Sequence, residues 1–213
     1  MGLLIACLHT AASNAGVFDD ALRILDAPGV RLAHHAQPDL LAEAEAAGGL
    51  TPALAARTAA ALQGLAQHAG AVLLTCSTLG PAAEDARAAV PVLHTDAALA
   101  QEAVRHGGAA VALCAAPTTL EPTRRLFEAA ARTTGATVHV QLVPGAWAAF
   151  HAGDASRYWS LVAQAADAAA GTGTVVALAQ ASMAPAAALA LHGPLTSPAA
   201  GLRAAIAAAA AWA

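Results

Sequence analysis

One cysteine of this chain stands where a reactive thiol is expected. The apolar run Ala71–Thr75 is typical of a buried β-strand and ends directly before Cys76. Leu79–Pro81 then leads into the Ala-rich stretch 82–89, which predicts a helix. A thiol at a helix start meets unpaired backbone N–H groups and the positive end of the helix dipole, and both favour the reactive thiolate. We therefore predict that Cys76 carries the chemistry of this protein.

Short polar side chains follow five predicted strands. They are His9 and Thr10, Ser77 and Thr78, Asp96, Thr118 and Thr119, and Gln180 and Ser182. Ligands of parallel sheets bind beyond the C-terminal strand ends, so we expect these side chains to bind substrate. Structural alternatives stay open: the hydroxyls and Asp96 would also cap helices, His9 would be a loop imidazole, and Gln180 a solvated amide.

The other two cysteines are predicted to be core residues. Cys7 lies in the middle of a predicted strand, and Cys114 precedes the threonine loop, where a displaced second catalytic thiol is the alternative. An odd number of widely spaced cysteines argues against a disulfide framework and favours a reducing compartment, so we expect a cytoplasmic protein. No CxxC or HxxxH pattern occurs and the adjacent His34 and His35 point apart, so we predict no metal site.

Composition excludes several classes of function. The formal net charge is −4 with no basic stripe, so we expect no nucleic-acid partner. All 10 basic residues are arginine, which excludes a lysine Schiff base, pyridoxal phosphate chemistry and a P-loop. No GxGxxG follows a strand, and no uninterrupted apolar run is long enough to span a membrane, so we expect neither a dinucleotide nor a membrane partner.

Strand and helix signals alternate along all 213 residues, which indicates an α/β fold with parallel sheets. The pattern restarts after Gly107-Gly108, and the last helix is expected to return to the first half. We therefore divide the chain into a first domain, 1–96 plus 196–213, that carries Cys76, and a second domain, 97–195. We predict a helix that Thr51 caps and that runs to about His68, a helix that Asp154 caps, and a helix that begins at Ser182 and runs to about Leu191.

Three segments together resemble the aspartate/glutamate/hydantoin racemase superfamily. They are Leu74–Thr78, the threonine loop Pro117–Thr123 and Val176–Ala184. The resemblance covers essentially the whole chain. It implies two pseudo-symmetric Rossmann-like domains with an active site between them, no cofactor, and a homodimer. In such racemases one cysteine thiolate removes the α-proton of the substrate and a second thiol delivers a proton from the opposite face.

Cys76 matches the first of these cysteines, and Gln180 occupies the position of the second. An amide donates hydrogen bonds but holds no mobile proton near neutral pH, so the resemblance predicts a one-thiol enzyme rather than a true racemase. Cys76 would protonate a carbanion left by decarboxylation or attack an activated double bond, with Gln180 polarising an enediolate oxygen.

The predicted function is therefore that of an isomerase or a decarboxylase/lyase-type enzyme acting on a small carboxylate or carbonyl compound. The alternatives are a non-catalytic protein that binds small carboxylates and, more remotely, a redox-sensing thiol protein. Arg57, Arg124 and Arg125 are interpreted as a solvated face rather than a carboxylate clamp.

Overall fold

Two α/β units make up residues 2–212, the part of the chain that the computed structural model describes. The first unit takes Met1–Thr95 and Pro198–Ala213, and the second takes Asp96–Ser197. The expected boundaries, after residues 96 and 195, fall after residues 95 and 197 instead. The second unit is thus inserted into the sequence of the first.

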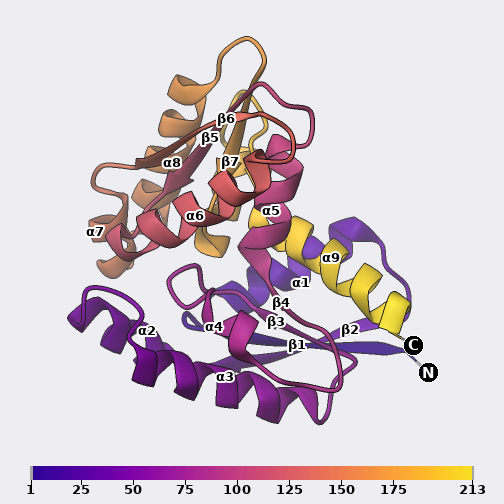
Figure 1. Ribbon diagram of the computed structural model, residues 1–213. Helices are drawn as coiled ribbons and strands as arrows, with labels where there is room; N and C mark the ends of the chain where they lie inside the picture. The colour runs from indigo at the N-terminus through magenta and orange to yellow at the C-terminus, as the bar shows by residue number, and fades with distance from the viewer. Residues whose placement is uncertain (1, 213) are drawn as a thin grey trace. The chain divides into compact units, whose positions relative to one another are not determined.

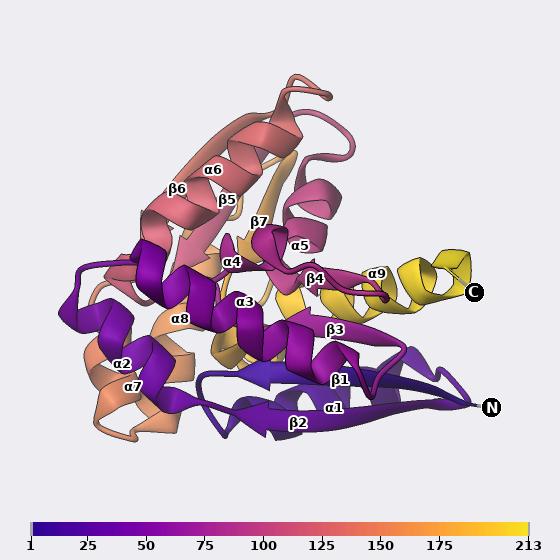
Figure 2. The same ribbon diagram turned by 60° about the horizontal axis from the view of Figure 1, so that its bottom comes forward.

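The first unit is built on a four-stranded parallel sheet with the order β2-β1-β3-β4. Its strands are β1 (Leu3–His9), β2 (Val30–Ala36), β3 (Ala71–Leu74) and β4 (Val92–His94). Its helices are α1 (Asn14–Leu25), α2 (Pro38–Ala46), α3 (Pro52–Ala66), α4 (Ala82–Asp85) and α9 (Ser197–Trp212). Helix α1 covers one face of the sheet and α3 the other (Figure 1 and Figure 2).

Successive side chains of β1 point to opposite faces of the sheet, so its two faces have different neighbours. Ala6 and Leu8 point into the apolar core that α2 and α3 cover, together with Val72 and Leu74 of β3. Cys7 and His9 therefore point to the opposite face. There the His9 ring lies 5.4 Å from the ring of Phe18 on α1, measured between centroids.

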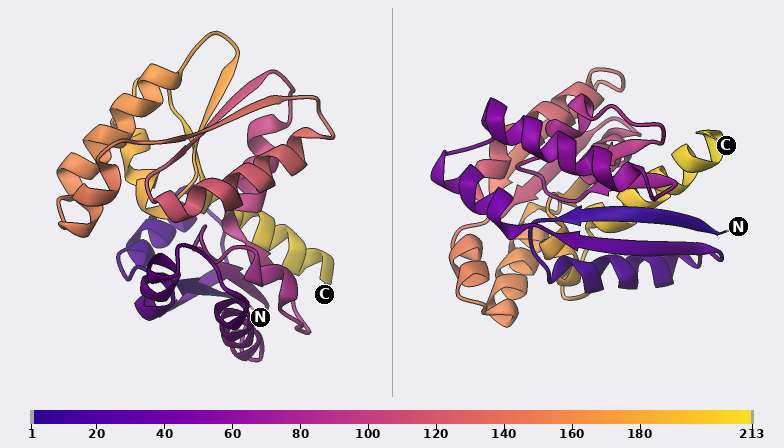
Figure 3. Two further views of the ribbon diagram at one scale, coloured as in Figure 1. Left: turned by 60° about the vertical axis from the view of Figure 1, so that its left-hand side comes forward. Right: turned by 90° about the horizontal axis from the view of Figure 1, so that it is seen from below.

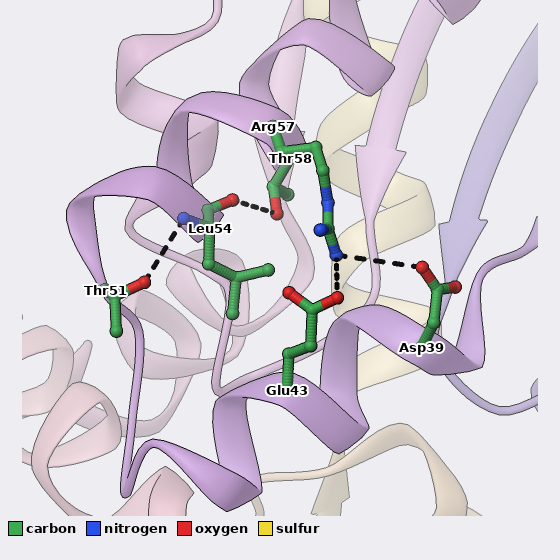
Figure 4. Close-up of polar contacts among 6 residues, drawn as sticks. All are labelled: Asp39, Glu43, Thr51, Leu54, Arg57 and Thr58. Atoms are coloured by element: carbon green, nitrogen blue, oxygen red, sulfur yellow. Dashed lines mark hydrogen bonds and ion pairs between the residues drawn. The ribbon is translucent and has the colours of Figure 1, made fainter.

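Helices α2 and α3 are held by side-chain contacts at their exposed side (Figure 4). The hydroxyl of Thr51 accepts a hydrogen bond from the Leu54 N–H at 3.3 Å, which confirms the predicted N-cap of α3. The Arg57 guanidinium reaches across to α2 and lies 2.8 Å from a carboxylate oxygen of Glu43 and 3.7 Å from one of Asp39. All three side chains are about half exposed or more, so these are solvent-exposed ion pairs between α2 and α3 that contribute little to stability.

The second unit repeats the same strand order, β6-β5-β7-β8, and is again parallel. Its strands are β5 (Ala109–Cys114), β6 (Thr137–Leu142), β7 (Thr174–Leu178) and β8 (Leu195–Thr196). Its helices are α5 (Thr95–Val104), α6 (Leu120–Ala131), α7 (Ala146–His151) and α8 (Ala155–Ala169), with 3-10 helices η1 (Pro117–Thr119) and η2 (Ala181–Ala188). Helices α6 and α8 lie on opposite sides of this sheet (Figure 3).

The core of the second unit follows from the same alternation. Val111 and Leu113 of β5 and Val176 and Leu178 of β7 face Tyr158 and its neighbours on α8. The expected α/β class with parallel sheets is confirmed. No helix in the described residues is both long and apolar enough to cross a membrane.

Several elements differ from the sequence-based prediction. Helix α4 ends at Asp85 instead of continuing to residue 89, because the chain must turn back in an extended form to start β4 at Val92 beside β3. The segment after Gln180 forms the 3-10 helix η2 rather than an α-helix. Elements α2, α7 and β8 were not predicted.

Candidate active site

Cys76 is the second residue after the end of β3. The strand is fully buried, and Cys76 itself is 6% exposed. It packs in the apolar core of the first unit with Leu74 and Leu79, and the following Ser77 and Thr78 are buried as well. The predicted position at a strand end is confirmed, but the four-residue α4 is too short to supply the expected helix dipole. Any activation of the thiol therefore has to come from its local surroundings.

The loop after Cys76 requires a glycine for close packing. At Gly80 a Cβ atom would collide with the imidazole ring of His94, the last residue of β4. The absence of a side chain lets the loop lie directly against that ring. Residues 77–81 are thereby fixed in a tight turn around the Cys76 position.

Gln180 occupies the equivalent position in the second unit. It is the second residue after β7, which has the same place in its sheet as β3 has in the first. The hydrogen bonds agree: the Thr75 N–H donates to the Leu8 carbonyl at 3.1 Å, and the Ala179 N–H donates to the Leu113 carbonyl at 2.9 Å. Cys76 and Gln180 thus follow matching strands at matching distances.

The Gln180 amide is fixed by two backbone donors. Its Oε1 accepts hydrogen bonds from the N–H groups of Ala115, at 2.5 Å, and Ala116, at 2.9 Å. Because both partners are donors, the atom facing them must be the oxygen, and Nε2 is on the other side of the amide. The side chain is 9% exposed. Gln180 therefore ties the end of β7 to the end of β5 and offers a donor, not a proton carrier.

The threonine loop is partly structural. Thr119 is buried, and its hydroxyl donates to the Ala116 carbonyl at 2.7 Å, while Thr118 is half-buried in η1. Glu121, in the first turn of α6, pairs with Arg124 and Arg125 on the exposed face of that helix. The hydrogen bond from Arg125 lowers the pKa of the Glu121 carboxyl.

Ser182 faces α8. Its hydroxyl is 2.8 Å from the hydroxyl of Tyr158, and its carbonyl accepts from Trp159 Nε1 at 3.1 Å. Burial raises the pKa of the Tyr158 phenol, so this group stays protonated well beyond neutral pH. The Ser182 side chain thus anchors η2 to α8.

His9 has both ring nitrogens engaged and is fully buried. Its Nδ1 is 2.8 Å from the hydroxyl of Thr75, and that hydroxyl donates to the Leu8 carbonyl at 3.1 Å, so Nδ1 must be the donor. Its Nε2 is 2.8 Å from Nδ1 of His34, whose Nε2 is 3.1 Å from a carboxylate oxygen of Asp19. Burial, with help from the nearby histidines, lowers the pKa of His9 to about 4, so the ring is neutral at pH 7.

The remaining predicted residues are also buried. Thr10 is 7% exposed at the end of β1, and Asp96 is 1% exposed in the first turn of α5. Cys7 and Cys114 are both fully buried, as predicted for core residues. Burial raises the pKa of Cys7 to about 12 and also raises that of Cys114, whose Sγ is 3.5 Å from the Thr123 hydroxyl.

The predicted site residues form two sets, each at the C-terminal edge of one sheet. His9, Thr10, Cys76, Ser77 and Thr78 follow strands of the first sheet, as does Asp96, the second residue after β4. Thr118, Thr119, Gln180 and Ser182 follow strands of the second sheet. Their contact with a substrate stays a prediction. A cavity of about 570 Å³ lies between α5 and α6 of the second unit, and none of these residues lines it.

The contacts of His9 with Thr75 and His34 could not be predicted from the sequence. The pairing of Cys7 with His34 across β1 and β2 brings His34 to the same face as Cys7 and His9. Only the alternation along β1 was visible in the sequence; the register between the strands was not. The hydrogen bonds of Thr75 and Asp19 likewise depend on that register and on the placement of α1.

Comparison with known proteins identifies the fold. No family model and no curated protein matches the sequence. Among solved structures, the aspartate racemase of Picrophilus torridus is similar, with a TM-score of 0.77 and 13% identity over 98% of this chain and 95% of that one. The allantoin racemase of Klebsiella pneumoniae has a TM-score of 0.66 and 17% identity, covering 99% and 89%.

An arylmalonate decarboxylase structure is also similar, with a TM-score of 0.57 and 16% identity over 97% of this chain and 92% of the other. Identities this low establish the architecture and leave the activity to the residues. This chain therefore has the two-unit α/β fold of the aspartate, glutamate and allantoin racemases.

Proposed function

We propose that this protein is an enzyme of the aspartate/glutamate/hydantoin racemase superfamily that uses one thiol, Cys76, for proton transfer to a small carboxylate or carbonyl compound. The observation that carries the proposal is the match between Cys76 and Gln180. Each is the second residue after the equivalent strand, yet one is a thiol and the other an amide whose oxygen is held by two backbone N–H groups. The second proton carrier of a two-thiol racemase is therefore missing.

The fully buried Cys114 is a poor substitute for that second thiol. Leu113 of β5 and Leu8 of β1 are equivalent, because each accepts a hydrogen bond from the residue after the neighbouring strand. Cys114 follows Leu113 as His9 follows Leu8, so Cys114 matches His9 and not Cys76. Its raised pKa keeps it as a neutral thiol. One-thiol chemistry is the better fit to these residues.

The proposed reaction is a decarboxylation followed by protonation. Loss of CO2 from a malonate-type substrate leaves an electron pair on the α-carbon, delocalised as an enediolate. The Cys76 S–H then gives its proton to that carbon, and the resulting thiolate regains a proton from water. Gln180 Nε2 is proposed as a neutral hydrogen-bond donor to the enediolate oxygen, and the hydroxyls of Ser77, Thr78 and Thr118 as carboxylate contacts. The reaction needs no cofactor.

Fold relatives support this class of reaction. Two are named as racemases and one as a decarboxylase of arylmalonates, so the architecture accommodates both kinds of chemistry. Thr10, Asp96, Thr119, Ser182 and His9 remain proposed substrate contacts because each follows the C-terminal end of a parallel strand. A homodimer and a cytoplasmic location are likewise proposals from the resemblance and from the cysteine content.

Proton NMR in D2O tests the proposal with substituted malonates, hydantoins and amino acids as substrates. We expect turnover of one class, with one deuterium incorporated at the α-carbon and a single product enantiomer. Cys76→Ala should lower turnover by roughly 100-fold or more, the size typical of a lost general acid. Cys114→Ala is the matched control, because it removes a buried thiol at another strand end, and it should keep wild-type turnover.

The same data separate the second candidate, a carboxylate-binding protein without turnover. That candidate is favoured by the missing second proton carrier. Stabilisation in thermal unfolding by a carboxylate, without exchange or product from any substrate, would support it. Equal activity of wild type and Cys76→Ala would contradict the enzyme proposal outright.

A further inference from the structure

Three metal-ligating side chains lie together on the α1 face of the first sheet. Cys7 and His9 are two residues apart on β1, and His34 is the register partner of Cys7 on β2, so all three point to the same face. Their ligating atoms lie within 4.8 Å of one another. Cys7 and His9 are fully buried, while the side chain of His34 is 22% exposed.

The outward-facing nitrogens of both histidines are already held by acceptors. His9 Nδ1–H donates to the Thr75 hydroxyl, which is itself fixed by its bond to the Leu8 carbonyl. His34 Nε2 faces the Asp19 carboxylate at 3.1 Å and must therefore carry a proton. Ligand histidines of metal sites are typically oriented in this way, with the second ring nitrogen donating to a carboxylate or another oxygen.

The inward-facing nitrogens meet each other beside the sulfur of Cys7. His9 Nε2 and His34 Nδ1 are 2.8 Å apart, with one hydrogen between them. Two nitrogen ligands of a tetrahedral zinc ion stand about 3.3 Å apart, given Zn–N bonds of about 2.0–2.1 Å. An ion could therefore replace that hydrogen if the two ring nitrogens moved apart by only about half an ångström.

We infer that Cys7, His9 and His34 form a binding site for a divalent transition-metal ion of the zinc class, with Thr75 and Asp19 orienting the two imidazoles. One thiolate and two imidazoles suit Zn²⁺ or Co²⁺ and are poor ligands for Mg²⁺ or Ca²⁺. No sequence motif indicates this site, because the ligands come from two strands and their spacing matches no known metal-binding pattern.

Binding balances protons and charge. The Cys7 thiol releases its proton to solvent, and the hydrogen between His9 Nε2 and His34 Nδ1 leaves that position. Both nitrogens then turn a lone pair toward the ion. The bound ion with the thiolate carries one positive charge, and the Asp19 carboxylate beside His34 offsets it. Three protein ligands leave the fourth tetrahedral position to water.

Access to the site comes from the α1 side. The Asp19 side chain is 64% exposed and His34 is partly exposed, whereas Cys7 and His9 lie deeper. The ring of Phe18 packs against His9 from the same helix. An ion would thus enter past Asp19. The inference goes beyond the proposed function, because Cys76 is not one of the ligands.

Cobalt is the probe that reports the ligands directly. We expect the full-length protein, freed of metal with a chelator, to bind one equivalent of Co²⁺ with a thiolate-to-cobalt charge-transfer band and the visible bands of a tetrahedral site. Cys7→Ala should abolish the charge-transfer band, and Cys114→Ala and Cys76→Ala should retain it. The Cys76→Ala result keeps this test independent of the enzymatic one.

Two variants at the accessible end guard against a Cys7→Ala protein that fails to fold. His34→Ala should abolish the tetrahedral spectrum, while replacement of its exposed neighbour, His35→Ala, should not. Asp19→Asn should weaken Co²⁺ binding by roughly 10–100-fold, the usual size for a lost ligand-orienting group, with Asp20→Asn as the control. A spectrum without the thiolate band, or equal effects in each variant and its control, would overturn the inference.

Discussion

At the scale of single residues, Gln180 illustrates how one side chain serves both the framework and the proposed chemistry. Its oxygen is the acceptor for two backbone N–H groups that follow β5, which the strand ladder leaves without a strand partner. Its nitrogen is thereby oriented as a donor. The identity and the position of Gln180 could be read from the sequence, but its hydrogen bonds could not, because they join residues about 65 positions apart.

This double acceptor makes a specific prediction. Gln180→Ala leaves two buried N–H groups without an acceptor and should lower the free energy of unfolding by about 2 kcal/mol. Gln180→Glu keeps both acceptor bonds and should remain within about 1 kcal/mol of wild type. Urea denaturation measures both. Equal stabilities of the Ala and Glu variants would show that the amide oxygen is not holding the strand end.

Tyr158 gives a prediction about pH. Burial raises the pKa of its phenol above the ordinary value of 10.0, so the folded state holds the proton more tightly than the unfolded state. This contribution to stability is complete below pH 10 and is lost as the pH rises above it. Tyr158→Phe should cost about 1 kcal/mol at pH 7 through the lost bond to Ser182, and its stability should fall less steeply above pH 10. Parallel stability curves for the two proteins would exclude this account.

At the scale of elements, local sequence patterns predict helix starts and ends correctly where these depend on neighbouring residues. They predict them wrongly where contacts with the rest of the unit decide. The N-caps at Thr51 and Asp154 form as predicted, because each depends on contacts within one helical turn. The stretch 82–89 is rich in Ala, yet only Ala82–Asp85 is helical, since β4 must begin at Val92. Helix α2 was not predicted because its buried residues, Leu40 and Ala44, span barely one turn.

Two helical glycines provide a matched test of packing against propensity. In α9, a Cβ atom on Gly201 would lie 2.6 Å from a methyl carbon of Thr95 and 3.1 Å from its Cα, whereas a Cβ on Gly64 in α3 would meet nothing within 4 Å. Gly64→Ala should stabilise the protein by about 0.5–1 kcal/mol through helix propensity. Gly201→Ala should instead destabilise it by about 1–3 kcal/mol through overpacking. Thermal unfolding compares them, and stabilisation by Gly201→Ala would mean that α9 does not pack closely on Thr95.

At the scale of the whole molecule, the sequence predicts that the chain contains two similar α/β halves. Strand–helix alternation and the restart after Gly107 predicted two parallel-sheet halves, and both sheets have the same strand order. The cluster of Cys7, His9 and His34 could not be predicted in this way, because it requires the register of two strands from different parts of the chain. Periodicity predicts which face of a strand a residue occupies, but not which residue lies beside it.

The division into two units predicts which part of the chain folds on its own. The second unit is one continuous segment with its own sheet and core, so a fragment of residues 96–197 should fold alone. Cooperative thermal unfolding followed by circular dichroism would show this. A fragment of residues 1–95 lacks α9, with its buried Leu202 and Ala205, and should be markedly less stable. If neither fragment unfolds cooperatively, the two units depend on each other for folding.

The late return of α9 also has a consequence during synthesis on the ribosome. The four strands of the first sheet have all been made by residue 94, but their last helix follows only after the hundred or so residues of the second unit. At about 5–20 residues per second, that interval lasts roughly 5–20 s. For that time the nascent first sheet is without the apolar side chains of α9, which makes it a natural client for a ribosome-associated chaperone.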